Sequence, residues 1–181
     1  DEVTMDKTLR NLGVPVWGKE RPTTLLWLVI EDDSGRNMLN LDSEANFLAV
    51  IKNREVLRGI VLVHPLLDLV DSASLRPGDI WIGFEEPVLK ASRRYNTDTI
   101  LTGYISTQAP GIWEGTWTAF MGGKTISWHT EGDLPDIVLD EGIDGMSDVL
   151  ARQYARSSIF TEVAEVKITV TEIDNFDKYA R

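Results

Sequence analysis

The sequence contains no cysteine and only two histidines among its 181 residues. Without a thiol, the chain can form no disulfide, no thiolate zinc site and no CxxC redox centre, and it has no cysteine nucleophile. The short signatures of dinucleotide, hydrolase, zinc-protease and calcium sites (GxGxxG, GxSxG, HExxH and the EF-hand loop) are also absent. We therefore expect no cofactor.

Basic residues and long apolar runs are scarce. Lys and Arg number 18 against 29 Asp and Glu, which gives a net charge of −11. This charge repels phosphate backbones and anionic lipid head groups, so nucleic acid and acidic membranes are not expected partners. The longest uninterrupted apolar run, Leu25 to Ile30, is far shorter than the roughly 20 residues that cross a bilayer. Because the sequence starts at Asp1 without a methionine or an apolar leader, we expect that a signal peptide or upstream domain has been removed.

Three short apolar runs predict a parallel sheet. They span Leu25–Ile30, Ile60–Val63 and Ile100–Ile105, and segments with helical patterns separate them. Parallel strands need such crossovers, because a tight turn cannot join them. The spacing therefore predicts βαβ units.

The crossover helices have recognisable ends. One is predicted from about Glu44 to Leu57, with Asp42 or Ser43 as its cap. Leu66 to Val70 is apolar at helical spacing, and Glu85-Glu86-Pro87 opens a further helix. Lys90, Arg93 and Arg94 follow near the end of that helix, where they would complement its dipole.

Two alternating segments predict an antiparallel hairpin rich in tryptophan. Gly122-Gly123 between them suits a two-residue turn that requires positive φ at both positions. This turn would place Trp117 opposite Trp128 on the core face and Thr116 opposite His129 on the polar face.

The C-terminal third predicts one long helix and one more strand. The helix starts at Leu134-Pro135-Asp136, and its Gly142 and Gly145 would allow a close approach to the sheet. Ala164 to Val170 alternates as an edge strand does. We expect an α/β domain over residues 1–158, with residues 159–181 forming a strand and the start of a truncated C-terminal domain. The predicted fold class is α/β, a three-layer-like mixed sheet with parallel central strands, helical crossovers and an antiparallel Trp-rich hairpin.

The carboxyl ends of the parallel strands are the candidate site, because open α/β sheets bind ligands there. A histidine with several carboxylates at this edge could hold a divalent cation or work as an acid/base pair. The more common reading is that His64, before Pro65, satisfies backbone groups and that the carboxylates are solvated. The residues expected at this edge are Glu31, Asp32, Asp33, His64, Asp68, Asp71 and Ser106.

The six tryptophans divide into packed and open ones. Trp27 lies in a predicted buried strand, and Trp117 and Trp128 pair within the hairpin, so packing accounts for these three. Trp17, Trp81 and Trp113 remain open. Trp17 and Trp81 lie in loop-like segments, where an exposed aromatic side chain would mark a partner surface.

Five sequence motifs follow one another along the chain. They are Arg21-Pro22-x-Thr24-Leu25-x-Trp27-Leu28-Val29, Arg58-Gly59-Ile60-Val61-x-x-x-Pro65-Leu66-Leu67-Asp68, Ala91-Ser92-Arg93-Arg94-Tyr95-x-x-Asp98-x-Ile100-Leu101-x-Gly103, Trp113-x-Gly115-x-Trp117 and Leu150-Ala151-Arg152-x-Tyr154-Ala155.

Taken together, these motifs resemble a family of proteobacterial secreted proteins that is known only as a domain of unknown function. The resemblance spans roughly Leu9 to Ala155. It implies a signal peptide in the precursor, a periplasmic or envelope location, a further domain opening near Val163, and no defined catalytic residues. More distantly, the chain is similar to the α/β N-terminal domain of TolB and to the curli secretion lipoprotein, which bind proteins.

Two classes of function remain open at this point. The first is a non-catalytic module in the periplasm of a Gram-negative bacterium that acts through contacts with an envelope protein. The second is a metal-dependent hydrolase or a small-molecule binding protein that uses the acidic edge around His64. The candidate binding residues are His64, Asp68, Asp32, Trp81 and Trp17.

Overall fold

The structure is a computed structural model that describes residue 8 and residues 21–109 and 111–154. The predicted strand over Ala164–Val170, the division at residue 158 and Trp17 lie outside the described residues. The elements, in chain order, are β1 (Thr23–Asp32), β2 (Gly35–Met38), α2 (Ala45–Arg58), β3 (Val61–Val63), α3 (Leu69–Ser74), α4 (Pro77–Trp81), α5 (Glu85–Ser92), the 3-10 turn η1 (Arg93–Tyr95), β4 (Thr99–Ala109), β5 (Ile112–Met121), β6 (Lys124–Gly132) and α6 (Pro135–Tyr154).

The strands form one mixed sheet in the order β2, β1, β4, β5, β6, with β3 beside β1. β1 pairs in parallel with β3 and with β4, so that Leu25 lies opposite Val63 on one side and Ile100 on the other. β2 is antiparallel to β1, and β4, β5 and β6 follow one another antiparallel. The predicted parallel centre and antiparallel hairpin are both confirmed.

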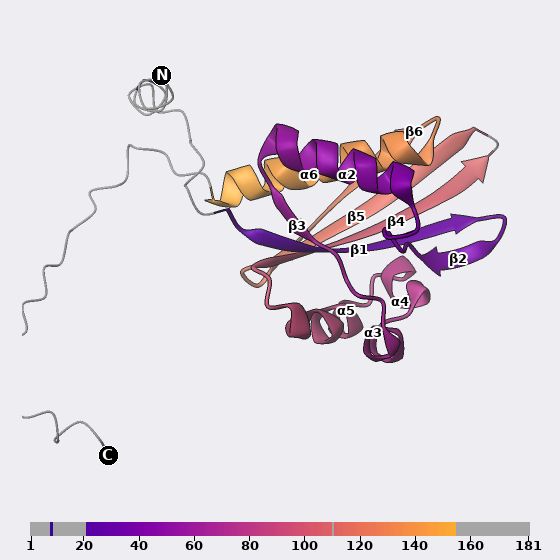
Figure 1. The fold of residues 1–181 in the computed structure, drawn as a ribbon, viewed down its shortest axis with the longest axis horizontal. Coiled ribbons are helices and arrows are strands. Elements are labelled where there is room, and N and C mark those ends of the chain that lie inside the picture. The colour runs from indigo at the N-terminus through magenta and orange to yellow at the C-terminus, as the bar shows by residue number, and fades with distance from the viewer. Residues whose placement is uncertain (1–7, 9–20, 110, 155–181) are drawn as a thin grey trace, which may run out of the picture.

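Helices cover both faces of the sheet, which gives three layers (Figure 1). α2 and α6 lie on one face, where Leu26, Ile51 and Leu139 belong to the larger apolar core. α3, α4 and α5 lie on the other face over a smaller core that contains Trp27 and Leu75. The run Leu25–Val29 is buried on both sides because each face of β1 has its own helical layer.

The tryptophan hairpin forms as its sequence predicts. Gly122 and Gly123 have φ of 52° and 74°, the positive values that a two-residue hairpin turn requires. Trp117 lies opposite Trp128 with ring centroids 6.5 Å apart, and Thr116 lies opposite His129. Trp117 is fully buried, and its indole Nε1 donates to Thr130 Oγ1 at 2.9 Å.

Three local details differ from the sequence prediction. Glu44 is the N-cap of α2 without a side-chain hydrogen bond, because Ser43 Oγ instead donates to Asn40 O within the preceding turn. β2 was not predicted, since Gly35–Met38 carries no apolar alternation. α3 begins only at Leu69, and its apolar residues face solvent: Leu69 is 89% exposed.

Candidate functional site

The predicted strand-end edge divides into two separate places. β3 is only three residues long and ends opposite Leu25, whereas β1 continues to Asp32. Six residues separate Leu25 from Glu31, about 20 Å along a strand. The structure therefore places Asp32 at the end of β1, with Ser106 of β4 opposite the neighbouring Glu31. His64 follows β3 and lies near the start of β1.

The end of β1 carries a compact group of four side chains, here the strand-end cluster: Glu31, Arg36, Trp81 and Tyr104. β2 places Arg36 opposite Glu31, and Arg36 Nε and Nη2 donate to Glu31 Oε2 at 3.0 and 2.8 Å. The Tyr104 hydroxyl donates to the same carboxylate. These bonds, the one from Tyr104 first and those from Arg36 second, lower the pKa of Glu31 below its ordinary value. Glu31 is consequently held as an anion, with Oε2 accepting from both Arg36 and Tyr104.

The guanidinium of Arg36 also supports Trp81. It lies 4.1 Å from the centre of the Trp81 ring and 5.7 Å from that of Tyr104. This stacking fixes one face of the indole while the side chain stays 52% exposed. Asp32 nearby accepts from the Ser34 hydroxyl at 2.5 Å and from the Ser34 backbone N–H at 2.8 Å, and these turn contacts, the hydroxyl first, lower the pKa of Asp32.

Trp81, expected in a loop, is the last residue of α4, and it belongs to an exposed apolar group that we call the turn patch: Trp81, Ile82 and Phe84. Their exposed fractions are 52, 50 and 56%. The turn is fixed by its backbone, because Phe84 N donates to Asp79 O at 2.8 Å and Gly83 takes a φ of 72°. Three large apolar side chains are thus displayed on an ordered turn.

A second group, the α3 ionic cluster, consists of Asp68, Asp71, Arg94 and Tyr95. Asp68 caps α3 and receives two hydrogen bonds from Arg94, at 2.8 and 2.9 Å. The Arg94 guanidinium accordingly lowers the pKa of Asp68 to about 2. Asp71 is buried and accepts from Arg94 at 3.1 Å and from the Tyr95 hydroxyl. Asp68 and Arg94 therefore tie α3 to η1, the 3-10 turn that follows α5.

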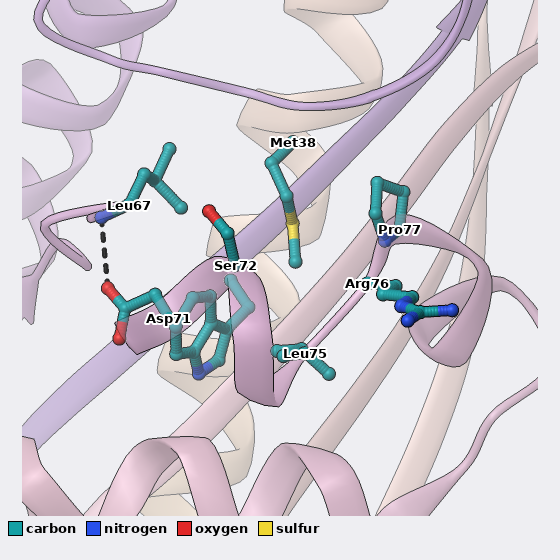
Figure 2. A pocket seen from close by; sticks show the side chains of 8 residues that line it. Met38, Leu67, Asp71, Ser72, Leu75, Arg76 and Pro77 are labelled. Atoms are coloured by element: carbon teal, nitrogen blue, oxygen red, sulfur yellow. Dashed lines mark hydrogen bonds between the residues drawn. The ribbon is translucent and has the colours of Figure 1, made fainter. Parts of the chain in front are cut away.

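The backbone before α3 is strained and borders a small cavity. Leu67 has a φ of 51°, which a non-glycine residue rarely adopts. Two hydrogen bonds hold it, from Leu67 N to Asp71 at 2.9 Å and from Leu66 N to the Tyr95 hydroxyl at 2.9 Å. The first is drawn in Figure 2 beside the side chains that line the cavity.

This cavity has a volume of about 230 Å³. Its wall is mainly apolar, and both carboxylate oxygens of Asp71 are already bonded to the protein. The cavity is smaller than most small-molecule sites, which start near 300 Å³. The lining residues are Trp27, Met38, Leu67, Asp71, Ser72, Leu75, Arg76 and Pro77.

His64 lies apart from both clusters, at the end of β3. Both of its ring nitrogens are buried, and within residues 21–109 and 111–154 neither has a hydrogen-bond partner. Burial is the main cause that lowers its pKa, and the charge of Lys52 adds to this. Among the residues that the structure describes, no three His, Asp or Glu side chains are arranged to hold a metal ion.

The sequence pointed to Trp81, Asp32 and Asp68 but missed the residues that surround them. Arg36 was not expected, because β2 itself was not predicted. Tyr104 lies in the predicted strand Ile100–Ile105, but its contact with Glu31 depends on how β4 pairs with β1. Ile82 and Phe84 flank Gly83 in a loop, a signal that sequence reasoning could have used.

Comparison with known proteins yields only weak structural similarities. No family model matches the chain, and no curated protein matches it either. Among solved structures, the LpoB C-terminal domain from Salmonella enterica matches with a TM-score of 0.38 and 18% identity, covering 70% of this chain and 89% of that chain. Lipoprotein GNA1162 from Neisseria meningitidis gives a TM-score of 0.40 and 14% identity over 73% and 95% of the two chains. Both TM-scores lie below 0.5, so the function is argued from this chain's own residues.

No helix within the described ranges has both the length and the apolar composition for a membrane span.

Proposed function

We propose that this chain is a non-catalytic module that binds a protein partner, with the turn patch as its contact surface. The observation that carries the proposal is the exposure of Trp81, Ile82 and Phe84 on an ordered turn. A solvated protein surface usually avoids such a group, and large exposed apolar patches commonly mark protein interfaces. Trp81 stacked on Arg36 adds the two residue types that dominate interface hot spots.

The turn patch is already ordered, so binding should cost it little conformational entropy. The backbone bond from Phe84 to Asp79 and the stacking of Arg36 restrain the patch before any partner arrives. Preorganisation of this kind improves affinity because fewer side chains must be ordered on binding. Within the strand-end cluster and within the α3 ionic cluster, the charged side chains bond to one another. These clusters therefore hold elements of the fold together, as expected for a module that binds and does not catalyse.

The expected partner is a protein surface with apolar side chains flanked by Lys or Arg. Exposed Glu85 and Glu86 follow directly after Phe84 in the first turn of α5. The net charge of −11 would attract a basic surface at long range. The periplasm of a Gram-negative bacterium as the place of this contact rests on the sequence resemblance.

Site-specific photo-crosslinking in the native envelope tests the proposal. A photoreactive residue at Phe84 should capture one protein, and the adduct should disappear when W81A is added. Leu57 is a matched control, since it is 64% exposed but lies on α2 across the sheet. Equal adducts from positions 57 and 84, or none from position 84, would contradict the proposal.

The alternative is a metal-dependent hydrolase or a small-molecule binding protein at His64, which the sequence had placed on an acidic edge. One observation favours it: the two buried nitrogens of His64 have no hydrogen-bond partner in the part of the chain that the structure describes, so a ligand could bind them. Thermal unfolding with Zn²⁺, Mn²⁺ or Mg²⁺ separates the two functions. A metal site predicts a rise in Tm that is lost in H64A, whereas the binding module predicts no metal effect in either protein.

A further inference from the structure

The two edges of the sheet are treated differently. At the β3 edge, the backbone N–H of Leu62 is taken by the Glu55 carboxylate at 2.9 Å, so a side chain occupies the position that a further strand would need. At the other edge, β6 runs nine residues from Lys124 to Gly132 without proline or bulge. No strand among the described residues pairs with its outer side.

The hairpin register shows which backbone groups of β6 point outward. A two-residue turn is closed by a hydrogen-bonded pair, here Met121 and Lys124, and such pairs alternate along an antiparallel ladder. Even-numbered residues of β6 therefore bond to β5. The N–H and C=O groups of the odd-numbered residues point away from the sheet; these are Thr125, Ser127, His129 and Glu131.

The side chains along this edge separate into a polar and an apolar side. The four outward residues are exposed on the face opposite to α6. On the α6 side, Ile126 is 38% exposed beside the half-buried Trp128. Leu134 of the β6–α6 connection and Ile137 in the first turn of α6 are 56 and 42% exposed. A strand added here would gain backbone bonds and could also cover apolar side chains.

We propose that a second copy of this chain adds to this edge, with the two β6 strands antiparallel about a two-fold axis at Trp128. In this register Thr125 lies opposite Glu131 of the second copy, and Ser127 lies opposite His129 of the second copy. All four outward residues of each chain are then paired. A shift of two residues in either direction leaves one of them unpaired in each chain, so the edge itself selects the register.

The same register suits the side chains. Trp128 of the two chains meet on the α6 side, each diagonal to Ile126 of the other copy, within the reach of cross-strand aromatic pairs. Lys124 faces Gly132 of the second copy, and no like charges face one another. A two-fold interface needs such self-complementarity, because one surface must fit itself.

The interface should be modest and should depend on salt. The edge is about 30 Å long, at the lower end of specific protein interfaces. Two chains of charge −11 repel one another, so added salt should strengthen the dimer. Salt would instead weaken the contact of β6 with a basic partner protein. The direction of the salt effect therefore distinguishes a second copy of the chain from a basic partner.

The absence of native cysteine makes disulfide trapping a direct test in the full chain. T125C and E131C chains, mixed and oxidised, should form a heterodimer, because the paired Cα atoms would be about 5.5 Å apart. Either variant alone should stay largely unlinked, since its own sulfurs would be separated by about 20 Å. A mixture that links no better than the single variants would overturn the proposal.

Sedimentation at increasing concentration gives a second, independent readout. S127P removes an outward N–H that β5 does not use, so it should fold and yet raise the dimer Kd about tenfold or more. S127A, which retains the N–H, is the matched control and should dimerise like the wild type. The proposal is refuted if the wild type stays monomeric at every concentration, or if S127P leaves the dimer Kd unchanged.

Discussion

The indole of Trp117 lies directly against the backbone of Gly142. A Cβ built at Gly142 would stand 2.0 Å from Trp117 Cε2, and a Cβ at Gly145 would stand 2.5 Å from Trp128 Nε1. These two glycines of α6 thus accept the stacked tryptophans of the hairpin. The close approach lets a long helix lie flat on β5 and β6.

G142A should therefore destabilise the protein strongly. The added methyl group has no room beside the fully buried Trp117, and overpacking of a core typically costs about 1–3 kcal/mol. Urea unfolding followed by circular dichroism measures the change in the free energy of unfolding. G78A is the control, because a Cβ at Gly78 meets nothing within 4 Å and φ there is not positive. Equal stability of G142A and G78A would contradict the packing described here.

The hairpin and the α6 glycines were predictable because their signals are local. Gly122-Gly123 requires its turn whatever surrounds it, and the turn then fixes Trp117 opposite Trp128. The glycines of α6 interrupt an otherwise apolar helical stripe, and close packing is the physical reason for such an interruption. Local chemistry was sufficient to predict this half of the fold.

The candidate site was less predictable because it depends on distances between elements. Nothing in the sequence states that β3 ends opposite Leu25, which separates His64 from the end of β1. Arg36 reaches Glu31 and Trp81 only because β2 folds back along β1, and a polar four-residue strand has no hydrophobic pattern. Leu66 to Val70 is apolar at helical spacing, a pattern typical of a buried helix face, whereas Leu69 is exposed in the structure.

R94Q should make the protein less stable at neutral pH and less sensitive to acid. Arg94 holds the pKa of Asp68 at about 2, below the ordinary aspartate value of 3.8, so the folded state binds fewer protons than the unfolded state between these two pH values. The stability that the Asp68–Arg94 pair contributes to the folded state is present above pH 4 and is lost as the pH falls towards 2. Without Arg94 that contribution is already absent at pH 7, and the loss below pH 4 should be smaller.

Urea midpoints at pH 7, 4 and 3 compare R94Q with the wild type. R93Q is the matched control, because no ion pair involves Arg93 among the described residues, and it should follow the wild-type profile. An R94Q curve parallel to the wild type at all three pH values would show that the pair does not contribute.

H64L should stabilise the protein, and more so in mild acid. Removing two buried nitrogens that lack partners should gain about 1 kcal/mol. The lowered pKa of His64 means that, as the pH falls below 6.5, the unfolded state takes up a proton before the folded state does. Wild-type stability is therefore lost from pH 6.5 downward, and H64L does not have this loss.

The measurement is the difference in unfolding free energy between H64L and wild type at pH 7.5 and 5.5. Lys52, Glu55 and Asp42 provide the charges that act on His64, and none of them changes in this variant. H129L alters an exposed histidine and should show no gain at either pH. A gain that is the same at both pH values would mean that the imidazole is charged equally in the folded and unfolded states.

Arg36 and Trp81 should show a measurable coupling energy. The guanidinium lies 4.1 Å from the ring centre at a partly exposed site, where a cation–π contact contributes about 0.5–1 kcal/mol. A double-mutant cycle with R36A and W81A isolates this term from the pairing of Arg36 with Glu31, because that pairing is lost equally on both sides of the cycle. Lys90 has no stacking contact with Trp81, so a cycle with K90A and W81A should give no coupling. Coupling of the first pair near zero would leave the indole free to move, and the turn patch would then have to be ordered by its partner and not before it.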